Sequence, residues 1–229
     1  MDKVVRMIRH WVEHFGSERE PVIVIDDFTG RIAEFVAAGR RGRYDPVAGY
    51  PGVRAPVDPA YLALGEPLLG QLLAEHFGLT KRFRAESCSF SIVSIPPEKL
   101  AAAQRRPHYD GADPNLIAMV HYTQGAGSGG TAFYRHRRTG YEAITPERVA
   151  RYEASVREDD AEFAALAPAY YHGDSDRYEL IGEIEPRPDR LIAYRGRQLH
   201  SGVIPSPPDA ALTIESARLT INTFLIGEV

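Results

Sequence analysis

Residues 83–95 read FRAESCSFSIVSI, and this stretch decides the class of fold that the sequence predicts. Serine and apolar side chains are interleaved through it, and Pro96 and Pro97 end it, as is typical of a β-strand. Further strands are predicted over residues 116–123, 131–134, 178–184, 190–194, 198–203 and 218–226. Many short strands separated by turns predict a mainly β domain with flanking helices, built as a sandwich or a barrel.

The first third of the chain has a more helical pattern. Helices are predicted over residues 3–15, 31–38 and 59–77, a buried strand over 21–28 and an irregular loop over 40–59. Gly78 is well placed to end the last of these helices. We therefore expect residues 1–80 to form a helical support for a β core over 83–226, within a single domain of 229 residues.

One helix is predicted to interrupt the β region, over residues 145–166. Thr145 is a good N-cap, Pro146 suits the first helical position, and Glu147 adds negative charge there. The sequence has no repeat or composition break that would mark a linker. We interpret the helix as an insertion between strands, which could shape a substrate entrance or the interface of a homodimer.

The composition is ordinary for a globular protein, with 44% hydrophobic and 25% charged residues. A net charge of −4 gives no electrostatic reason to expect binding to nucleic acid or to a membrane surface. No apolar run approaches the ~20 residues of a membrane helix, and residues 1–15 lack a signal-peptide core. With a single cysteine, Cys88, no intramolecular disulfide is possible. A cytoplasmic protein is predicted.

The chemistry of the chain is indicated by His108, Asp110 and His200. In an extended segment, His-x-Asp places both side chains on the same face, and a third ligand from a distant strand can close the site. Two histidines and one carboxylate can hold one face of iron(II) and leave positions open for a co-substrate and oxygen. Arg218 lies further along the chain, on a predicted strand, and can anchor the far carboxylate of a keto-acid.

These motifs, in this order, resemble the prolyl-4-hydroxylase-like branch of the iron/2-oxoglutarate dioxygenases. The matching stretches are residues 107–110 (PHYD), 129–134 (GGTAFY), His200 and 218–220 (RLT), with an opening strand at 22–28 (VIVIDDF). The resemblance covers roughly residues 21–226. In addition, residues 50–56 (YPGVRAP) resemble a signature of an uncharacterised bacterial family within this branch.

The resemblance implies a double-stranded β-helix, or cupin-like jelly roll, with helices packed outside it. It implies Fe(II) held by His108, Asp110 and His200, with 2-oxoglutarate and O2 as co-substrates. Arg218 would bind the keto-acid, and Thr220 on the same strand face could bond the same carboxylate. Tyr122 matches a position where related enzymes use a tyrosine hydroxyl for that carboxylate, although it can equally be a core aromatic. The implied reaction oxidises a small molecule or a protein side chain and releases succinate and CO2.

Two departures from the family pattern leave alternatives open. The gap from His200 to Arg218 is 18 residues, longer than in most relatives, so residues 205–216 are predicted to bulge out as a loop. Arg195 or Arg197 could replace Arg218. The basic run 135–138 (RHRR) could receive an acidic partner or be a solvated turn. The alternatives at the level of function are a metal-dependent β-barrel enzyme that does not use 2-oxoglutarate and a non-catalytic ligand-binding protein.

Overall fold

The computed structural model describes residues 8–209 and 211–228 and contains two antiparallel β-sheets, which do not close into a barrel. The larger sheet has the order β1 (His10–His14), β2 (Pro21–Ile25), β9 (Arg190–Arg195), β6 (Leu116–Tyr122), β11 (Leu219–Gly227), β5 (Phe83–Val93), β4 (Gly52–Pro56) and β3 (Asp45–Pro46). The smaller sheet has the order β10 (His200–Gly202), β7 (Thr131–His136) and β8 (Tyr178–Ile184). The mainly β fold with flanking helices is confirmed.

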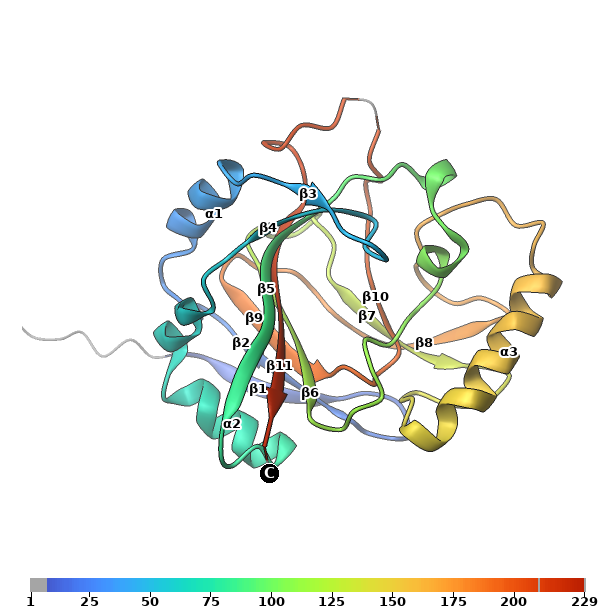
Figure 1. Cartoon of the computed structure of the whole chain (residues 1–229), viewed down its shortest axis with the longest axis horizontal. Helices are drawn as coiled ribbons and strands as arrows, with labels where there is room; N and C mark the ends of the chain where they lie inside the picture. The colour runs from blue at the N-terminus through green and yellow to red at the C-terminus, as the bar shows by residue number, and fades with distance from the viewer. Residues whose placement is uncertain (1–7, 210, 229) are drawn as a thin grey trace, which may run out of the picture.

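In the described part of the chain, three α-helices flank the sheets (Figure 1). The first two, α1 (Ile32–Arg40) and α2 (Leu68–Phe77), pack against the larger sheet, and α3 (Val149–Glu162) packs against the smaller one. Short 3-10 turns are η1 (Pro59–Gly65), η2 (Pro97–Lys99), η3 (Ala102–Arg105) and η4 (Pro146–Arg148). Among the described residues, no helix has both the length and the apolar character needed to span a membrane.

Strand alternation divides the core into layers. On β11, Leu219 and Ile221 face the apolar cluster under α1 and α2, whereas Phe224 faces the space between the two sheets. In that space Tyr194 of the larger sheet meets Phe133 of the smaller sheet edge to face, with ring centroids 5.1 Å apart. Polar residues on the inward faces of the strands therefore share one enclosed region between the sheets.

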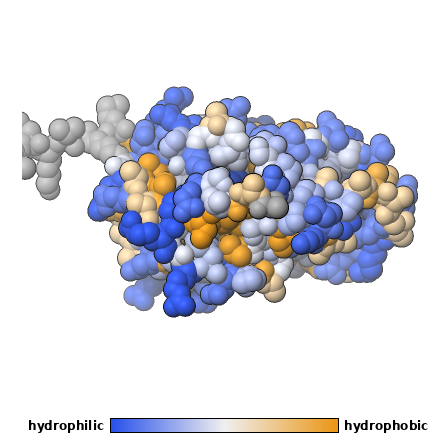
Figure 2. Space-filling model, turned by 90° about the horizontal axis from the view of Figure 1, so that it is seen from above, coloured by the Kyte–Doolittle hydropathy of each residue, from blue (hydrophilic) through white to orange (hydrophobic). Residues whose placement is uncertain are grey.

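Figure 2 shows one face of the molecule, seen from the side on which the loop between β10 and β11 rises in Figure 1. Hydrophilic side chains dominate its edge, and apolar side chains gather near its middle. The described part of residues 205–216 contains no strand or helix, which confirms the predicted loop. The extra length between His200 and Arg218 is thus accommodated outside the sheets.

The predicted helix over residues 3–15 is wrong where the structure describes it, because residues 10–14 form strand β1; residues 1–7 lie outside the described residues. Ile8, Trp11, Val12 and Phe15 have helical spacing, but they pack on both faces of an edge strand, Val12 on one and Trp11 on the other. Pairing of β1 with β2 satisfies the backbone, and this tertiary contact outweighs the local pattern.

The predicted helical support over residues 1–80 is also wrong in part. The expected loop at 40–59 contains β3 and β4, and β4 pairs with β5 along its whole length. The expected helix at 59–77 divides into η1 and α2 at Pro67, because proline has no amide hydrogen and does not fit a helix interior. The helix over 31–38 and the end of α2 at Gly78, which has a positive φ of 73°, are confirmed.

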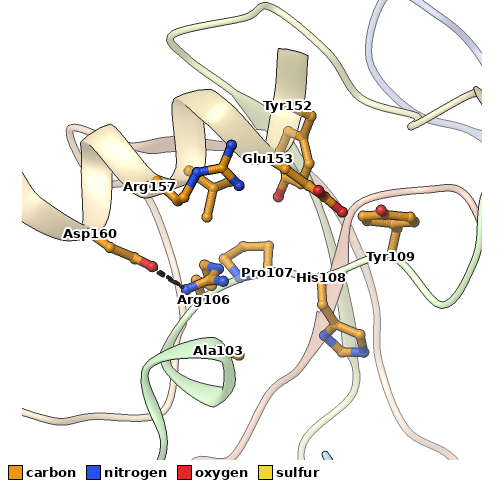
Figure 3. Close-up of a pocket in the computed structure, with 10 residues that line it drawn as sticks. Ala103, Arg106, Pro107, His108, Tyr109, Tyr152, Glu153, Arg157 and Asp160 are labelled. Carbon is orange, nitrogen blue, oxygen red and sulfur yellow. Dashed lines mark hydrogen bonds and ion pairs between the residues drawn. The ribbon is translucent and has the colours of Figure 1, made fainter. Parts of the chain in front are cut away.

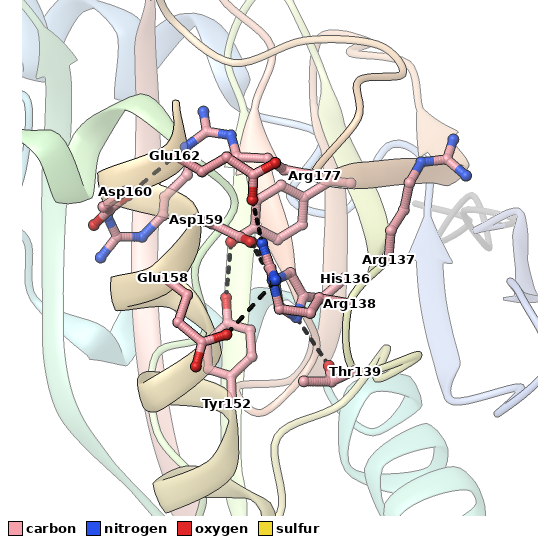
Figure 4. A network of polar contacts seen from close by, with 12 residues as sticks. His136, Arg137, Arg138, Thr139, Tyr152, Glu158, Asp159, Asp160, Glu162 and Arg177 are labelled. Carbon is pink, nitrogen blue, oxygen red and sulfur yellow. Dashed lines mark hydrogen bonds and ion pairs between the residues drawn. The ribbon is translucent and has the colours of Figure 1, made fainter. Parts of the chain in front are cut away.

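The insertion predicted over residues 145–166 contains η4 and α3, and a buried polar cluster anchors it to β7 (Figure 4). His136 lies 2.7 Å from a carboxylate oxygen of Asp159 on α3, and Arg138 donates to the other oxygen at 2.6 Å. Burial lowers the pKa of His136 below its ordinary value even though the hydrogen bond and the charge of Asp159 oppose this shift, and Nε2 of the imidazole donates to the carboxylate. The basic run 135–138 is thus paired within the protein, since Arg135 binds Glu142 and Arg137 binds Asp174.

Replacing Asp159 by Asn should destabilise the protein, because His136 and Arg138 would both lose a buried charged acceptor. We expect the free energy of unfolding to fall by about 1.5–3 kcal/mol, which lowers the melting temperature by about 3–12 °C in a chain of this size. Thermal unfolding followed by circular dichroism at neutral pH measures this. The control is Glu158→Gln, an exposed residue of the same helix, and equal shifts in the two variants would contradict the anchoring role.

Candidate metal centre

The structure brings together the three side chains predicted as metal ligands. His108 and His200 pair through two backbone hydrogen bonds of 2.9 Å, one in each direction. The amide of Asp110 donates to the carbonyl of Gly196 at 2.7 Å. The segment with His-x-Asp is thereby fixed beside the segment that leads into β10.

The ligand atoms of the three residues lie within 4.8 Å of one another. Nε2 of His108 is 3.7 Å from Oδ1 of Asp110, and Nε2 of His200 is 3.6 Å from Oδ2 of the same carboxylate. The His200 side chain is 7% exposed and that of Asp110 13%, whereas that of His108 is 52% exposed. His200 is thus buried, Asp110 is partly buried, and His108 lies at the mouth of the site.

His200 is oriented by its surroundings. Its Nδ1 lies 2.9 Å from the carbonyl oxygen of Gln198, and its ring packs edge to face on Tyr194 with centroids 4.8 Å apart. A proton on Nδ1 that is bonded to this carbonyl leaves Nε2 as the ligand atom. Burial lowers the pKa of His200 to about 4, so the imidazole is neutral and able to bind a metal at neutral pH.

Asp110 gives the clearest sign that the site suits a cation. Its Oδ2 is buried and has no hydrogen-bond partner among the described residues. Burial raises the pKa of this carboxyl to about 6, and His108 and Arg54 counteract the rise. A buried carboxylate oxygen left without a donor is unfavourable unless a cation balances it. Two neutral imidazoles and one carboxylate match the donor set of iron(II) sites with open positions.

The triad borders a cavity of about 480 Å³ between the two sheets. Its wall includes Thr131 of β7, Tyr194 of β9, and Asn222 and Phe224 of β11. A second groove, of about 330 Å³, lies between α3 and residues 106–109 (Figure 3). The two share Ala103, Arg106, His108 and Tyr109 in their walls. The insertion helix therefore borders a groove that adjoins the triad. This position is compatible with the predicted role of shaping a substrate entrance.

Arg218, predicted to bind the keto-acid, lies in the wall of this cavity. Its guanidinium donates to the carbonyl of Gly129 through Nε and Nη2, at 3.2 and 3.1 Å. Gly129 has a φ of 83°, and a side chain there would collide with the carbonyl of Val203. The Gly129-Gly130 turn thus holds the arginine in the cavity wall. Arg195 and Arg197, the alternatives to Arg218, instead form ion pairs with Glu20 and are absent from the cavity wall.

Thr220 and Tyr122, predicted to bind the keto-acid, are not part of the cavity wall, but each donates a hydrogen bond to a residue that is. The Thr220 hydroxyl donates to the side chain of Asn222 at 2.7 Å, and the Tyr122 hydroxyl donates to that of Thr131 at 2.7 Å. Thr131 and Asn222 line the cavity, whereas Thr220 and Tyr122 do not. Because Tyr122 supplies its proton to Thr131, the Thr131 hydroxyl can donate its own proton to a bound carboxylate.

Sequence reasoning missed several residues of this site. Thr131 lay within a matching stretch without an assigned role, and Tyr194 was included only in a predicted strand. Tyr50 and Arg54, which also line the cavity, lie in the YPGVRAP stretch that the sequence singled out without a function. The polar-aromatic composition of that stretch was the available signal. The sequence did not show that β4 turns it towards the triad.

These features define a mainly β protein with a preformed two-histidine, one-carboxylate centre. The chain belongs to the family described as "Family of unknown function (DUF6445)", whose model matches residues 6–225. Among curated proteins, none matches the sequence significantly.

Several solved structures resemble this chain at low sequence identity. The epimerase SnoN, in complex with Fe3+, alpha ketoglutarate and nogalamycin RO, is 12% identical with a TM-score of 0.50, over 92% of this chain and 80% of SnoN. HygX from Streptomyces hygroscopicus, with nickel and 2-oxoglutarate bound, is 13% identical with a TM-score of 0.47, over 92% of this chain and 84% of HygX. The viral collagen prolyl hydroxylase from Paramecium Bursaria Chlorella virus-1 is 10% identical with a TM-score of 0.47, over 91% and 96%. The similarity to SnoN is one of fold.

Proposed function

We propose that this protein is an Fe(II)- and 2-oxoglutarate-dependent dioxygenase on a double-stranded β-helix. The observation that carries the proposal is the buried Oδ2 of Asp110, which has no hydrogen-bond partner among the described residues and lies 3.6 Å from Nε2 of His200. The other carboxylate oxygen lies 3.7 Å from Nε2 of His108. SnoN, whose fold this chain shares, was crystallised with Fe3+ and alpha ketoglutarate. The sequence motifs and the fold thus support the same class of reaction.

In this proposal His108, Asp110 and His200 hold the iron, and Arg218 binds the far carboxylate of the keto-acid. When bound, iron and 2-oxoglutarate supply the activation of O2, with the release of succinate and CO2. Thr131 donates a second hydrogen bond to the same carboxylate, using the proton that its bond with Tyr122 leaves available. Tyr194 and Phe224 line the same cavity and limit the entry of water.

Anaerobic titration of metal-free protein with iron(II) and then 2-oxoglutarate tests this function. We expect a visible metal-to-ligand charge-transfer band to appear only after the keto-acid is added, because the band requires chelation of the iron. Succinate release in the presence of O2 would then permit a substrate screen. Iron binding without the band would favour a metal enzyme that does not use 2-oxoglutarate. No iron binding would favour a ligand-binding protein without this catalysis.

A further inference from the structure

The cavity beside the triad contains more positive charge than its own carboxylate balances. Among the residues that the structure describes, three arginines line it, Arg54, Arg106 and Arg218, but Asp110 is the only acidic residue in its wall. Arg106 is neutralised by Asp160 of α3, at 2.7 Å (Figure 3). Neither Arg54 nor Arg218 forms an ion pair with a carboxylate in the part of the chain that the structure describes.

Arg54 is fixed in place on β4. Its neighbours Val53 and Ala55 pack into the core under the helices, so Arg54 points to the opposite face of the sheet, towards the cavity. Its guanidinium carbon lies 4.3 Å from the centre of the Tyr50 ring, within the range of a cation–π contact. Its Nε is buried without a hydrogen-bond acceptor among the described residues. A positioned, partly desolvated cation without an acceptor is a binding group for an anion.

Arg54 and Arg218 reach the cavity wall from different segments, Arg54 from β4 and Arg218 from the residue before β11. Arg218 rests on the Gly129-Gly130 carbonyls, where the main cavity meets a neighbouring pocket under the loop between β10 and β11. Arg54 approaches from β4 and lines the same cavity as His108, Asp110 and His200. A group bound to Arg54 would therefore lie close to the triad.

The charges of the proposed cofactors determine how much positive charge remains to be balanced beside Arg54. Iron(II) with two neutral imidazoles and one carboxylate has a single net positive charge, and the two arginines add two more. A dianionic keto-acid, bound by the iron and by Arg218, leaves one positive charge. This charge is enough for one carboxylate and less than a phosphate dianion would require.

On the basis of the function proposed above, we propose that Arg54 binds a carboxylate of the primary substrate and that Tyr50 holds the guanidinium for it. A guanidinium donates two parallel hydrogen bonds to a carboxylate, so it fixes the orientation of the substrate as well as its affinity. Val93 and Ile204 line the same cavity and provide an apolar wall for the rest of the molecule. The substrate class is thus a small monocarboxylic acid with an apolar portion.

The test uses matched pairs of probes: phenylacetate, 3-phenylpropionate, hexanoate and octanoate, each with its primary amide. Each probe is titrated anaerobically into the protein loaded with iron(II) and 2-oxoglutarate, and its binding is followed by calorimetry and by changes in the charge-transfer band. We expect at least one acid to bind while its amide does not. Arg54→Gln should weaken binding of that acid at least about thirtyfold, and Arg54→Lys should retain part of it.

The variants also separate Arg54 from the keto-acid site. Arg54→Gln should change the affinity for 2-oxoglutarate less than about twofold, because the effects of independent sites add to within about 0.3–0.5 kcal/mol. The control Arg84→Gln removes the same charge from a side chain on β5 that is 74% exposed, and it should change neither affinity. Circular dichroism with thermal unfolding checks that each variant folds.

Three results would overturn the proposal: acids and amides that bind equally, no acid of the set bound by the native protein, or Arg54→Gln weakening 2-oxoglutarate instead of the acid. Absence of the charge-transfer band in the native protein is a separate failure, that of the proposed dioxygenase. In that case calorimetry on the metal-free protein still compares each acid with its amide. If the native protein binds an acid better than its amide and Arg54→Gln abolishes this difference, the carboxylate site is supported. If the native protein binds acid and amide equally, the site is rejected.

Discussion

His200→Ala is expected to weaken iron binding by more than about a hundredfold and to abolish succinate release. The substitution removes one of three ligands, and even changes in the residues that surround metal ligands cost about ten- to a hundredfold in affinity. Asp110 would also lose the imidazole nitrogen 3.6 Å from its buried Oδ2. Iron binding is measured by anaerobic calorimetry, and turnover by succinate released from 2-oxoglutarate.

The control for this variant is His14→Ala, which removes an exposed histidine at the end of β1. It should leave iron affinity and turnover unchanged. His200→Gln shows whether the loss depends on the imidazole or only on the filled space, since glutamine keeps most of the volume. Iron binding that survives in His200→Ala, with the protein folded, would exclude the triad as the metal centre.

The β core could be predicted from the sequence because its strands carry their signals locally. Alternation in β5 and β11 and the turn residues between strands are visible without knowledge of their neighbours. Strand β1 was not predictable in this way, since Val12 and Trp11 face different layers of the protein and together imitate a helix. Strand β4 was hidden by Pro51, Gly52 and Pro56, and only its pairing with β5 reveals it.

In the candidate site, too, some features follow from the local sequence and others depend on the three-dimensional structure. The sequence could predict that His108 and Asp110 lie together, because alternate residues of an extended segment share a face. It could predict His200 as the third member from the order of the motifs. The relation of Tyr122 to Thr131 depends on packing between two sheets, which no spacing in one chain segment encodes. The absence of a carboxylate partner for Arg54 is a three-dimensional property. The sequence indicated the type of chemistry, and the structure was needed to find the residues that line the cavity beside the triad.

Arg218→Ala should separate keto-acid binding from metal binding. Arg218 lies in the cavity wall without a carboxylate partner among the described residues, and the keto-acid would lose its charged anchor in the variant. Removing one member of a desolvated charge pair costs about 2–5 kcal/mol, so we expect the Kd of 2-oxoglutarate to rise at least about thirtyfold. The Kd of iron(II) should change less than about threefold, because the triad is unaltered. Both constants come from the anaerobic titration.

Two further variants make this result interpretable. Arg218→Lys keeps the charge but cannot reproduce the two-pronged hydrogen bonding, so it should recover only part of the affinity. Arg195→Ala removes an arginine that pairs with Glu20 outside the cavity, and it should leave the Kd of 2-oxoglutarate unchanged. Equal losses of iron and keto-acid affinity in folded Arg218→Ala would show that the arginine supports the whole site rather than the keto-acid. A loss of 2-oxoglutarate in Arg54→Gln, with none in Arg218→Ala, would exchange the roles of the two arginines.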